Sequence, residues 1–220
     1  MKNRTSDLWS YRLCFDRDRE YWNKFYTKNI TTEPSLFARF VLNYMEEGRS
    51  LLDIGCGNGR DSIFFACNGL LVTGIDASNV AIENLQKNGM VDKVAFVCDD
   101  FVNSDVYKRK FYYCYSRFSL HAINLEQQET LLKNLYFCLE NNGKLFVEAR
   151  SVNDKLYGKG KYIEKDAYVH DGHFRRFIRL EELEKAMIRI GFRIISSEEK
   201  INFAPFGNEN PPIIRMVAMK

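Results

Sequence analysis

The sequence lacks the long apolar runs and the cysteine pairs that mark several classes of protein. No uninterrupted apolar stretch approaches the roughly 20 residues that a membrane-spanning helix needs. The first 20 residues are too charged for a signal peptide. None of the six cysteines stands in a CxxC pair or at a metal-like spacing, and several lie in apolar runs, as reduced cysteines do. These absences predict a protein of the reducing cytoplasm that does not span a membrane.

The chain also lacks a strong charge of either sign. It carries 32 basic and 29 acidic residues, so its net charge is only +3. Proteins that grip duplex nucleic acid usually carry a larger basic excess, so no nucleic-acid partner is expected. A length of 220 residues with 45% hydrophobic residues suits a single α/β domain with additions.

Short β-rich apolar stretches alternate with helical patterns from residue 50 onward. The stretches lie at 50–55, 71–76, 93–99, 111–116 and 144–150. The clearest helical pattern spans 124–139, and Asn142-Gly143 predicts the turn that follows it. Alternation of this kind favours a parallel sheet covered on both faces.

The alternation of strands and helices stops after residue 150. It resumes with a predicted helix over 180–190 and strands near 192–199 and 213–219. Upstream, apolar residues over 36–44 predict a helix that Pro34 can open. We therefore expect one domain over 1–220, with an N-terminal helical cap (1–47) and an insertion (151–178).

A glycine-rich loop follows the first predicted strand in LLDIGCGNGRD (51–61). Its glycines, Gly55, Gly57 and Gly59, let the backbone approach a ligand at the start of a helix. Arg60 stands where the dinucleotide fingerprint needs a third glycine, and no GK[ST] follows, so neither NAD nor a P-loop nucleotide is favoured. Asp76 ends the next strand, where a carboxylate can accept hydrogen bonds from both hydroxyls of a ribose.

The segment DIGCGNGRDS, followed by GIDAS and CDDF, resembles the class I S-adenosylmethionine-dependent methyltransferases over about residues 20 to 150. The motif GCGNGRDS within it is most similar to the tellurite-resistance and thiopurine-like branch of this family. The resemblance implies a Rossmann-like α/β fold with a seven-stranded, mostly parallel sheet and an antiparallel last strand. It also implies S-adenosyl-L-methionine as cofactor and S-adenosyl-L-homocysteine as product.

Residue by residue, the resemblance assigns a cofactor role to several positions. Asp53, Gly55 and Gly57, with the rest of the loop to Gly59, would face the methionine part of the cofactor, and Asp76 the ribose. Asp100 would bind the adenine amino group with the Phe101 amide at the ring edge, and Asp99 matches less well. Trp22 and Tyr26 match an aromatic N-terminal lid, although core packing of a helix would explain them equally well.

The fourth strand ends in YSRFSLHAI (115–123), which places Ser116, Arg117 and His121 near the reacting sulfur. His121 could act as a general base, only position the acceptor, or be a structural residue bonded within its loop. The [DNS]PP[YF] sequence of adenine- and amide-N-methyltransferases is missing at this strand. No His/Asp/Glu cluster has metal-ligand spacing, so no metal is expected.

The insertion contains the cluster HDGHFRRF (170–177), and residues 150–177 hold seven basic against four acidic residues. The insertion directly follows the fifth predicted strand (144–150), so it starts at the edge of the sheet where Ser116, Arg117 and His121 lie. We therefore expect it to bind an anionic acceptor, with arginine forks on phosphate or carboxylate oxygens. Strand alternation lets only one of the two adjacent arginines face the cleft. The alternative is a solvated basic loop. The candidate acceptor-binding residues are Arg150, Tyr157, His170, His173, Arg175 and Arg176.

A narrower resemblance concerns SVNDKLYGKGK, HDGHFRRF and NFAPF, which are similar to methyltransferases associated with bacterial capsular-polysaccharide genes and O-methyl phosphoramidate. It implies O-methylation of a phosphoramidate- or phosphate-type group on a nucleotide-linked precursor. Other hypotheses are a detoxifying methyltransferase for tellurite, selenite or thiols, a nucleic-acid methyltransferase, and a catalytically silent cofactor-binding subunit. We expect a small anionic acceptor and a monomer or homodimer.

Overall fold

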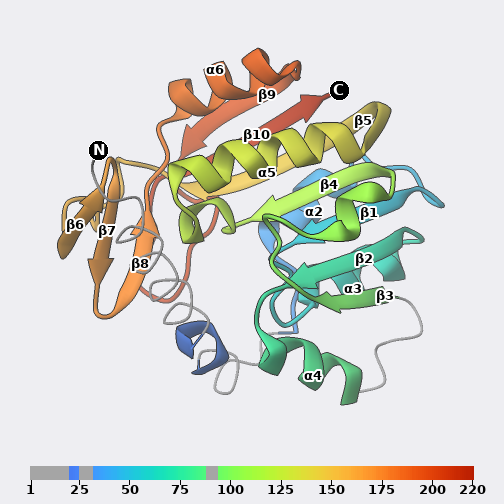
Figure 1. The fold of residues 1–220 in the computed structure, drawn as a ribbon, viewed down its shortest axis with the longest axis horizontal. Coiled ribbons are helices and arrows are strands. Elements are labelled where there is room, and N and C mark those ends of the chain that lie inside the picture. Colours follow the sequence, from blue (N-terminus) through green and yellow to red (C-terminus); the bar gives the residue numbers. More distant parts are fainter. Residues whose placement is uncertain (1–19, 25–31, 88–93) are drawn as a thin grey trace, which may run out of the picture.

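A computed structural model describes residues 20–24, 32–87 and 94–220 (Figure 1). The predicted cap therefore falls partly outside the described residues, and so does Tyr26. The elements of the main body are α2 (Leu36–Leu42), β1 (Ser50–Ile54), α3 (Arg60–Cys67), β2 (Leu71–Asp76), α4 (Asn79–Lys87), β3 (Val94–Cys98), η2 (Asp105–Lys108), β4 (Phe111–Arg117), η3 (Leu120–Ala122), α5 (Leu125–Cys138), β5 (Leu139–Arg150), α6 (Leu180–Ile190), β9 (Arg193–Lys200) and β10 (Ile213–Met219).

The main sheet has seven strands in the order β3-β2-β1-β4-β5-β10-β9. The pairs among β1 to β5 are parallel, whereas the last strand, β10, runs antiparallel to both β5 and β9. This topology confirms the predicted seven-stranded, mostly parallel sheet with an antiparallel last strand. It also brings the carboxyl ends of β1, β2, β4 and β5 to one edge, where open α/β sheets bind their ligands.

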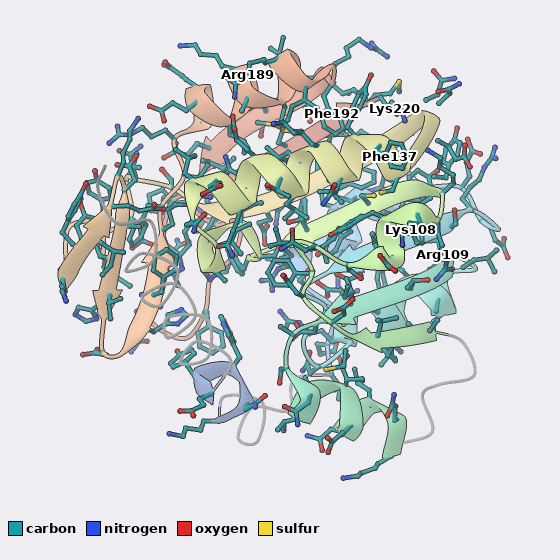
Figure 2. All side chains as sticks on the ribbon, in the orientation of Figure 1. Lys108, Arg109, Phe137, Arg189, Phe192 and Lys220 are labelled. Carbon is teal, nitrogen blue, oxygen red and sulfur yellow. The ribbon has the colours of Figure 1, made fainter. Side chains whose placement is uncertain are left out.

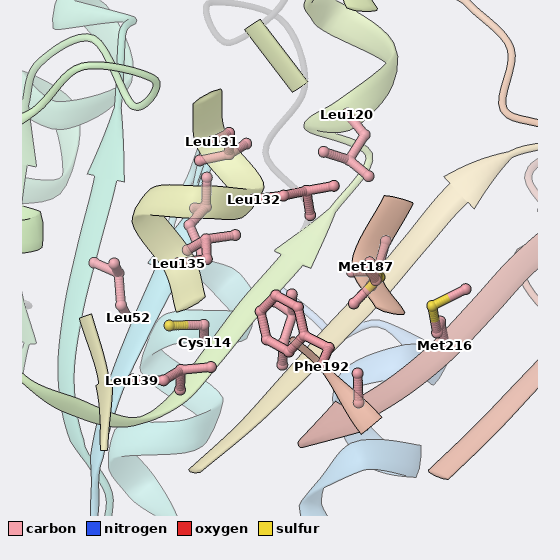
Figure 3. Packing of buried hydrophobic residues seen from close by; sticks show 14 of the residues in the cluster. Leu52, Cys114, Leu120, Leu131, Leu132, Leu135, Leu139, Met187, Phe192 and Met216 are labelled. Atoms are coloured by element: carbon pink, nitrogen blue, oxygen red, sulfur yellow. The ribbon is translucent and has the colours of Figure 1, made fainter. Parts of the chain in front are cut away.

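Both faces of the sheet are covered, and neighbouring residues of β1 show how. Leu51 packs with α2 and α3 on one face, whereas Leu52 packs with α5 and α6 on the other (Figure 1). Figure 3 shows the second layer, in which Leu131 and Leu135 of α5 and Phe192 point toward one another over the strands. The near-continuous apolar strands follow from this double burial.

Side chains define where the helices begin. Ser35 accepts a hydrogen bond from the Ala38 amide at 3.0 Å and so starts α2 one residue after the predicted Pro34. Asn124 and Gln127 form a reciprocal capping box at the start of α5. The predicted turn at Asn142-Gly143 was wrong, because β5 already begins at Leu139 and these residues form an irregularity within it, where Asn142 has a φ of 64°.

Basic residues gather at the end of the molecule away from the ligand-binding edge, around the carboxyl end of α5. Phe137 and Lys220 mark this end in Figure 2. Lys110 Nζ donates to Phe137 O at 2.6 Å and Lys220 Nζ donates to Leu139 O at 2.8 Å. Two ammonium groups thus satisfy carbonyls at a helix C-terminus, a structural use of the charge.

The insertion after β5 folds into a second sheet of three antiparallel strands, β6 (Lys161–Glu164), β7 (Ala167–His170) and β8 (His173–Arg176). The segment thus contains regular strands, the last of which carries Arg175 and Arg176. The small sheet lies beyond the carboxyl ends of the parallel strands (Figure 1). Hydrogen bonds from Ile178 N to Arg150 O and from Val152 N to Ile178 O tie its last strand back to the end of β5. Within the described part of the chain, no helix is long and apolar enough to cross a membrane.

Candidate active site

A cavity of about 640 Å³ opens where the parallel strands of the main sheet end. Its floor comes from the residues that follow β1, β2 and β4, and its far wall comes from β8 and the segment between β9 and β10. Tyr21, Trp22 and residues 33–36 complete it. The predicted site residues that line it are Trp22, Asp53, Gly55, Asp76, Phe101, Arg117, His121, Arg150, His173 and Arg175.

We call the part of the cavity lined by the predicted cofactor residues Asp53, Gly55 and Asp76 the cofactor half. Asp76 lies at its centre of hydrogen bonding. Its two carboxylate oxygens accept hydrogen bonds from the Gly57 and Ser78 amides, each at 2.8 Å, and burial raises the pKa of the carboxyl group. Each carboxylate oxygen has a second lone pair, and Asp76 lines the cavity, so the group can still accept from the two hydroxyls of a ribose. The glycine loop thus also fixes the position of the Asp76 carboxylate, through the Gly57 amide.

Gly55 is the loop glycine that lines the cavity, and its φ of 71° with a Cβ position 3.1 Å from Ser119 Cβ explains why a side chain does not fit. Gly57 and Gly59 do not line the cavity. Gly59 instead starts α3 with a φ of 71°, and a Cβ there would stand 2.8 Å from Leu85 Cδ2. The structure therefore gives Gly57 and Gly59 backbone and packing roles in place of the predicted ligand contact.

Asp53, at the end of β1, also faces the cavity. It accepts a hydrogen bond from Ser62 Oγ at 2.6 Å, and burial raises the pKa of Asp53 to about 8. Near neutral pH this carboxyl group is therefore largely protonated in the protein without ligand. A cationic group placed beside it would favour its ionised form.

Two further predicted cofactor residues, Asp100 and Ser116, do not line the cavity. Asp100 uses its carboxylate within its own turn, where Oδ1 accepts from Val102 N at 2.8 Å and Oδ2 accepts from Asn103 Nδ2 at 2.9 Å. Ser116 is fully buried and hydrogen-bonded to Ser119, so Ser119 lines the cavity in its place. Turn chemistry explains Asp100, because an aspartate readily bonds to the backbone two residues later.

The helical segment 20–24 contributes Tyr21 and Trp22 to the cavity lining. Tyr21 stacks on His173 with ring centroids 4.1 Å apart, and Trp22 meets the same ring edge-on at 5.3 Å. On the other side, Asn23 accepts from Ser78 Oγ at 2.6 Å, next to Asp76. The segment therefore connects the cofactor half to β8. The sequence did not single out Tyr21 or Asn23, because the contacts that place them, with His173 and Ser78, are distant along the chain.

We call the part of the cavity lined by His121 and the predicted acceptor-binding residues Arg150, His173 and Arg175 the acceptor half. His121 is buried in η3, and burial, together with the neighbouring His173 and the arginines, lowers the pKa of its imidazole well below the usual range. Among the described residues its Nδ1 atom finds no hydrogen-bond partner. His121 is therefore neutral at physiological pH and does not have the loop hydrogen bond that a structural histidine would make through this atom.

Three arginines line the same half, and they differ in how their charge is balanced. Arg117 donates to the buried Glu148 at 2.9 Å, and Arg150 donates to the buried Asp154 at 2.6 Å. Arg175 has no carboxylate within ion-pairing distance in the described part of the chain, and its buried Nε atom has no hydrogen-bond partner there. Burial and the charge of Arg150 lower the pKa of Arg175.

Arg176 points away from the cavity, as alternation along β8 requires. Its guanidinium donates to Ile123 O at 2.8 Å, to Leu120 O at 3.0 Å and to Gln128 Oε1 at 2.6 Å, so it holds the turn that carries His121. This placement corrects the expected acceptor-binding role of Arg176 to a structural one.

Tyr157 and His170 also lie outside the cavity. Tyr157 donates to Asp166 at 2.7 Å and accepts from Arg179 at 3.1 Å, which joins β6 and β7 to the start of α6. His170 is part-exposed beside Asp171 at the tip of the β7–β8 hairpin. Neither residue is in a position to contact an acceptor.

The segment between β9 and β10 supplies a wall that the sequence indicated only through NFAPF. Phe203, Phe206 and Glu209 of this segment line the cavity. Arg215 of β10 anchors it by donating to Phe203 O at 2.7 Å, and the same guanidinium donates to Glu148 at 2.7 Å. No group of three or more potential metal ligands occurs in the ranges that the structure describes.

Comparison with known proteins places the chain in a family. The family model described as "Methyltransferase domain" matches residues 26–197. The chain is 27% identical over 168 residues to the sterol 24-C-methyltransferase of Pneumocystis carinii, covering 70% of this chain but only 42% of that protein. The chain thus spans less than half the length of this curated relative.

Two solved structures share the fold. The structure of a Methanosarcina mazei S-adenosylmethionine-dependent methyltransferase has a TM-score of 0.71 and 21% identity, covering 82% of this chain and 96% of that one. The Burkholderia thailandensis 1,6-didemethyltoxoflavin-N1-methyltransferase, solved with S-adenosylhomocysteine, has a TM-score of 0.71 and 20% identity, covering 96% and 89%. At these identities the likeness establishes the fold alone.

The residues of the cavity fit the cofactor of such proteins. Asp76 keeps acceptor capacity for a ribose diol, Gly55 brings backbone to the cavity surface, and Asp53 offers a carboxyl group to the cationic methionine end. A volume of about 640 Å³ is ample for a nucleoside with a short amino-acid chain. On the matched family model the chain belongs to the methyltransferase-domain family, and its fold is that of the solved class I S-adenosylmethionine-dependent methyltransferases.

Proposed function

We propose that the protein transfers a methyl group from S-adenosylmethionine to a small acceptor that carries an anionic group. The observation that carries the proposal is Arg175, a part-buried guanidinium on the cavity wall without a carboxylate partner among the described residues. Burying an uncompensated charge is costly, so such a residue is usually retained for a ligand of opposite charge.

The other two arginines support this assignment by contrast. Arg117 and Arg150 each have a buried carboxylate of their own, so their charges are balanced before any ligand arrives. Arg175 is the arginine in this half of the cavity whose fork is left for an acceptor. A planar fork matches phosphate-type or carboxylate oxygens with two parallel hydrogen bonds.

The state of His121 favours an acceptor that is already ionised. A strong general base needs a pKa near the working pH, whereas burial and neighbouring cations hold the pKa of His121 far below it. An anionic oxygen needs no proton removed, and a neutral imidazole can then orient it or its neighbour. Bound S-adenosylmethionine supplies an electrophilic methyl group, Asp76 holds the cofactor, and Trp22 covers the reacting centre from water.

Within this class we propose O-methylation of a phosphate-type group, a phosphoramidate on a nucleotide-linked precursor of a capsular polysaccharide being the acceptor that the sequence resemblance suggests. The uncompensated fork of Arg175 supports a doubly charged or strongly polar group. A neutral thiol would leave Arg175 buried and unpaired, so a thiol acceptor does not account for it, whereas tellurite and selenite are themselves oxyanions.

The experiment offers three acceptors of one scaffold to the protein with labelled S-adenosylmethionine: a phosphate monoester, a phosphoramidate and the corresponding thiol. Methyl transfer to one of the two anionic acceptors is expected. Arg175→Gln should lower kcat/KM by roughly 30- to 1000-fold, the effect of losing about 2–4 kcal/mol from a desolvated charge pair.

Lys159→Gln is the matched control, because it removes one positive charge from an exposed site of the same insertion. It should leave the kinetics unchanged. Efficient transfer to the thiol that does not depend on Arg175 would contradict the anionic acceptor and favour the detoxification hypothesis.

A further inference from the structure

A tight hairpin hangs from the segment between β9 and β10 over the acceptor half of the cavity. Phe206 N donates to Glu209 O and Glu209 N donates to Phe206 O, both at 2.9 Å, around the turn residues Gly207 and Asn208. Gly207 adopts the positive φ of 54° that such a two-residue turn needs. The hairpin therefore sets the position of Glu209 through its backbone, and the Glu209 side chain lines the cavity.

Glu209 faces Arg150, but the contact is loose. Its Oε2 atom lies 3.6 Å from Arg150 Nη2, beyond hydrogen-bond range, and its side chain is 40% exposed. Asp154 holds the same guanidinium at 2.6 Å with a side chain that is fully buried. Asp154 is thus the permanent partner of Arg150, whereas a long, half-exposed ion pair contributes little and can be exchanged.

The charge of Glu209 also acts on Arg175. Burial and the neighbouring charge of Arg150 lower the pKa of Arg175, whereas Tyr21, Asp154 and Glu209 oppose that effect. One exchangeable carboxylate therefore lies 3.6 Å from Arg150 and lines the same cavity as Arg175. This is the position that the anionic group of an acceptor would take.

We infer that Glu209 is an internal competitor for the acceptor's anionic group: it occupies the anion subsite of Arg150 and Arg175 in the free protein and must leave before that group binds. The inference rests on the proposed function, since it takes the acceptor to be anionic. It makes Glu209 a residue that determines specificity, because a group with a weak or diffuse charge does not displace it while a phosphate-type group does. Release needs only side-chain rotation, so the hairpin itself can stay in place.

Pyrophosphate is the probe, titrated by calorimetry at constant salt into protein saturated with S-adenosylhomocysteine. Glu209→Gln should bind pyrophosphate about two- to fivefold more tightly than the unsubstituted protein, the range set by a half-exposed ion pair. Glu33→Gln is the matched control, since it removes the same charge from another cavity-lining glutamate that pairs with Arg39. It should leave the affinity unchanged.

Arg175→Gln separates the two levels of the argument. If pyrophosphate binding depends on Arg175 and Glu209→Gln alone strengthens it, the competitor role is supported. If binding depends on Arg175 but the two glutamate variants behave alike, the competitor role is overturned and the anionic acceptor stands. If neither the unsubstituted protein nor Glu209→Gln binds pyrophosphate through Arg175, both the anion subsite and the competitor role are overturned. An unchanged unfolding temperature and unchanged S-adenosylhomocysteine affinity show that each variant is folded.

Discussion

Replacing Arg176 by methionine should destabilise the protein, whereas the same change at Arg175 should not. Arg176 makes three charged hydrogen bonds, each of a kind that contributes about 1.5–3 kcal/mol. They share one guanidinium and do not add in full, and burial lowers the pKa of Arg176 to about 10, so that keeping the charge buried costs about 3 kcal/mol. Loss of the net stabilisation, together with unpaired carbonyl oxygens at Leu120 and Ile123, should reduce the free energy of unfolding by about 2–4 kcal/mol.

Urea unfolding followed by circular dichroism measures this difference, and the melting temperature should fall by roughly 5–15 °C in a chain of this size. Arg175→Met is the matched control, because it removes the same group from the other face of β8 and should keep or raise stability. Two results would refute the assignment of the two arginines. One is a free energy of unfolding of Arg176→Met within about 0.5 kcal/mol of that of the unsubstituted protein, and the other is an Arg175→Met variant that is less stable than Arg176→Met.

Two further perturbations test the cofactor half. Since burial raises the pKa of Asp53 to about 8, this carboxyl group stabilises the free protein at acid pH, and the effect is lost as the pH rises through 8. A cationic ligand group beside Asp53 favours its ionised form, so binding of S-adenosylmethionine at pH 7 should release up to about one proton per ligand. Calorimetry in buffers of different ionisation enthalpy measures the release, which should vanish in Asp53→Asn. Gly59→Ala should lower the free energy of unfolding by about 1–3 kcal/mol more than Gly158→Ala, because both have positive φ but only at Gly59 would a Cβ collide, 2.8 Å from Leu85 Cδ2. Equal losses in the two glycine variants, measured by urea unfolding, would show that crowding at Gly59 is unimportant.

The main sheet was predictable because its signals are local. Strands buried along most of their length, such as 71–76, are mostly apolar, and the helix over 124–139 shows its apolar stripe within four turns. Asn142-Gly143 misled the prediction, since the same dipeptide serves a turn or an irregularity inside a strand, and only the pairing of β5 with β4 decides between them.

The candidate site was predictable where a residue ends a strand and less so where a side chain has a choice of partner. Asp76 and Arg150 reach the cavity because strand ends of a parallel sheet share one edge. Arg175 and Arg176 are equivalent in sequence, and only the register of β8 against β7 sends one to the cavity and the other to the η3 carbonyls. Glu209 could not be foreseen, because its contact with Arg150 spans 59 residues of chain and depends on where the hairpin folds.

Cofactor binding through Asp76 is tested most directly by calorimetric titration of S-adenosylmethionine into the unsubstituted protein and into Asp76→Asn. Loss of charged hydrogen bonds to the ribose should weaken binding by roughly 10- to 150-fold, corresponding to about 1.5–3 kcal/mol. Asp99→Asn, the same change at the end of the adjacent strand in a residue that does not line the cavity, should bind as the unsubstituted protein does. A folded Asp76→Asn variant with unchanged affinity, or equal losses in the two variants, would contradict the placement of the cofactor.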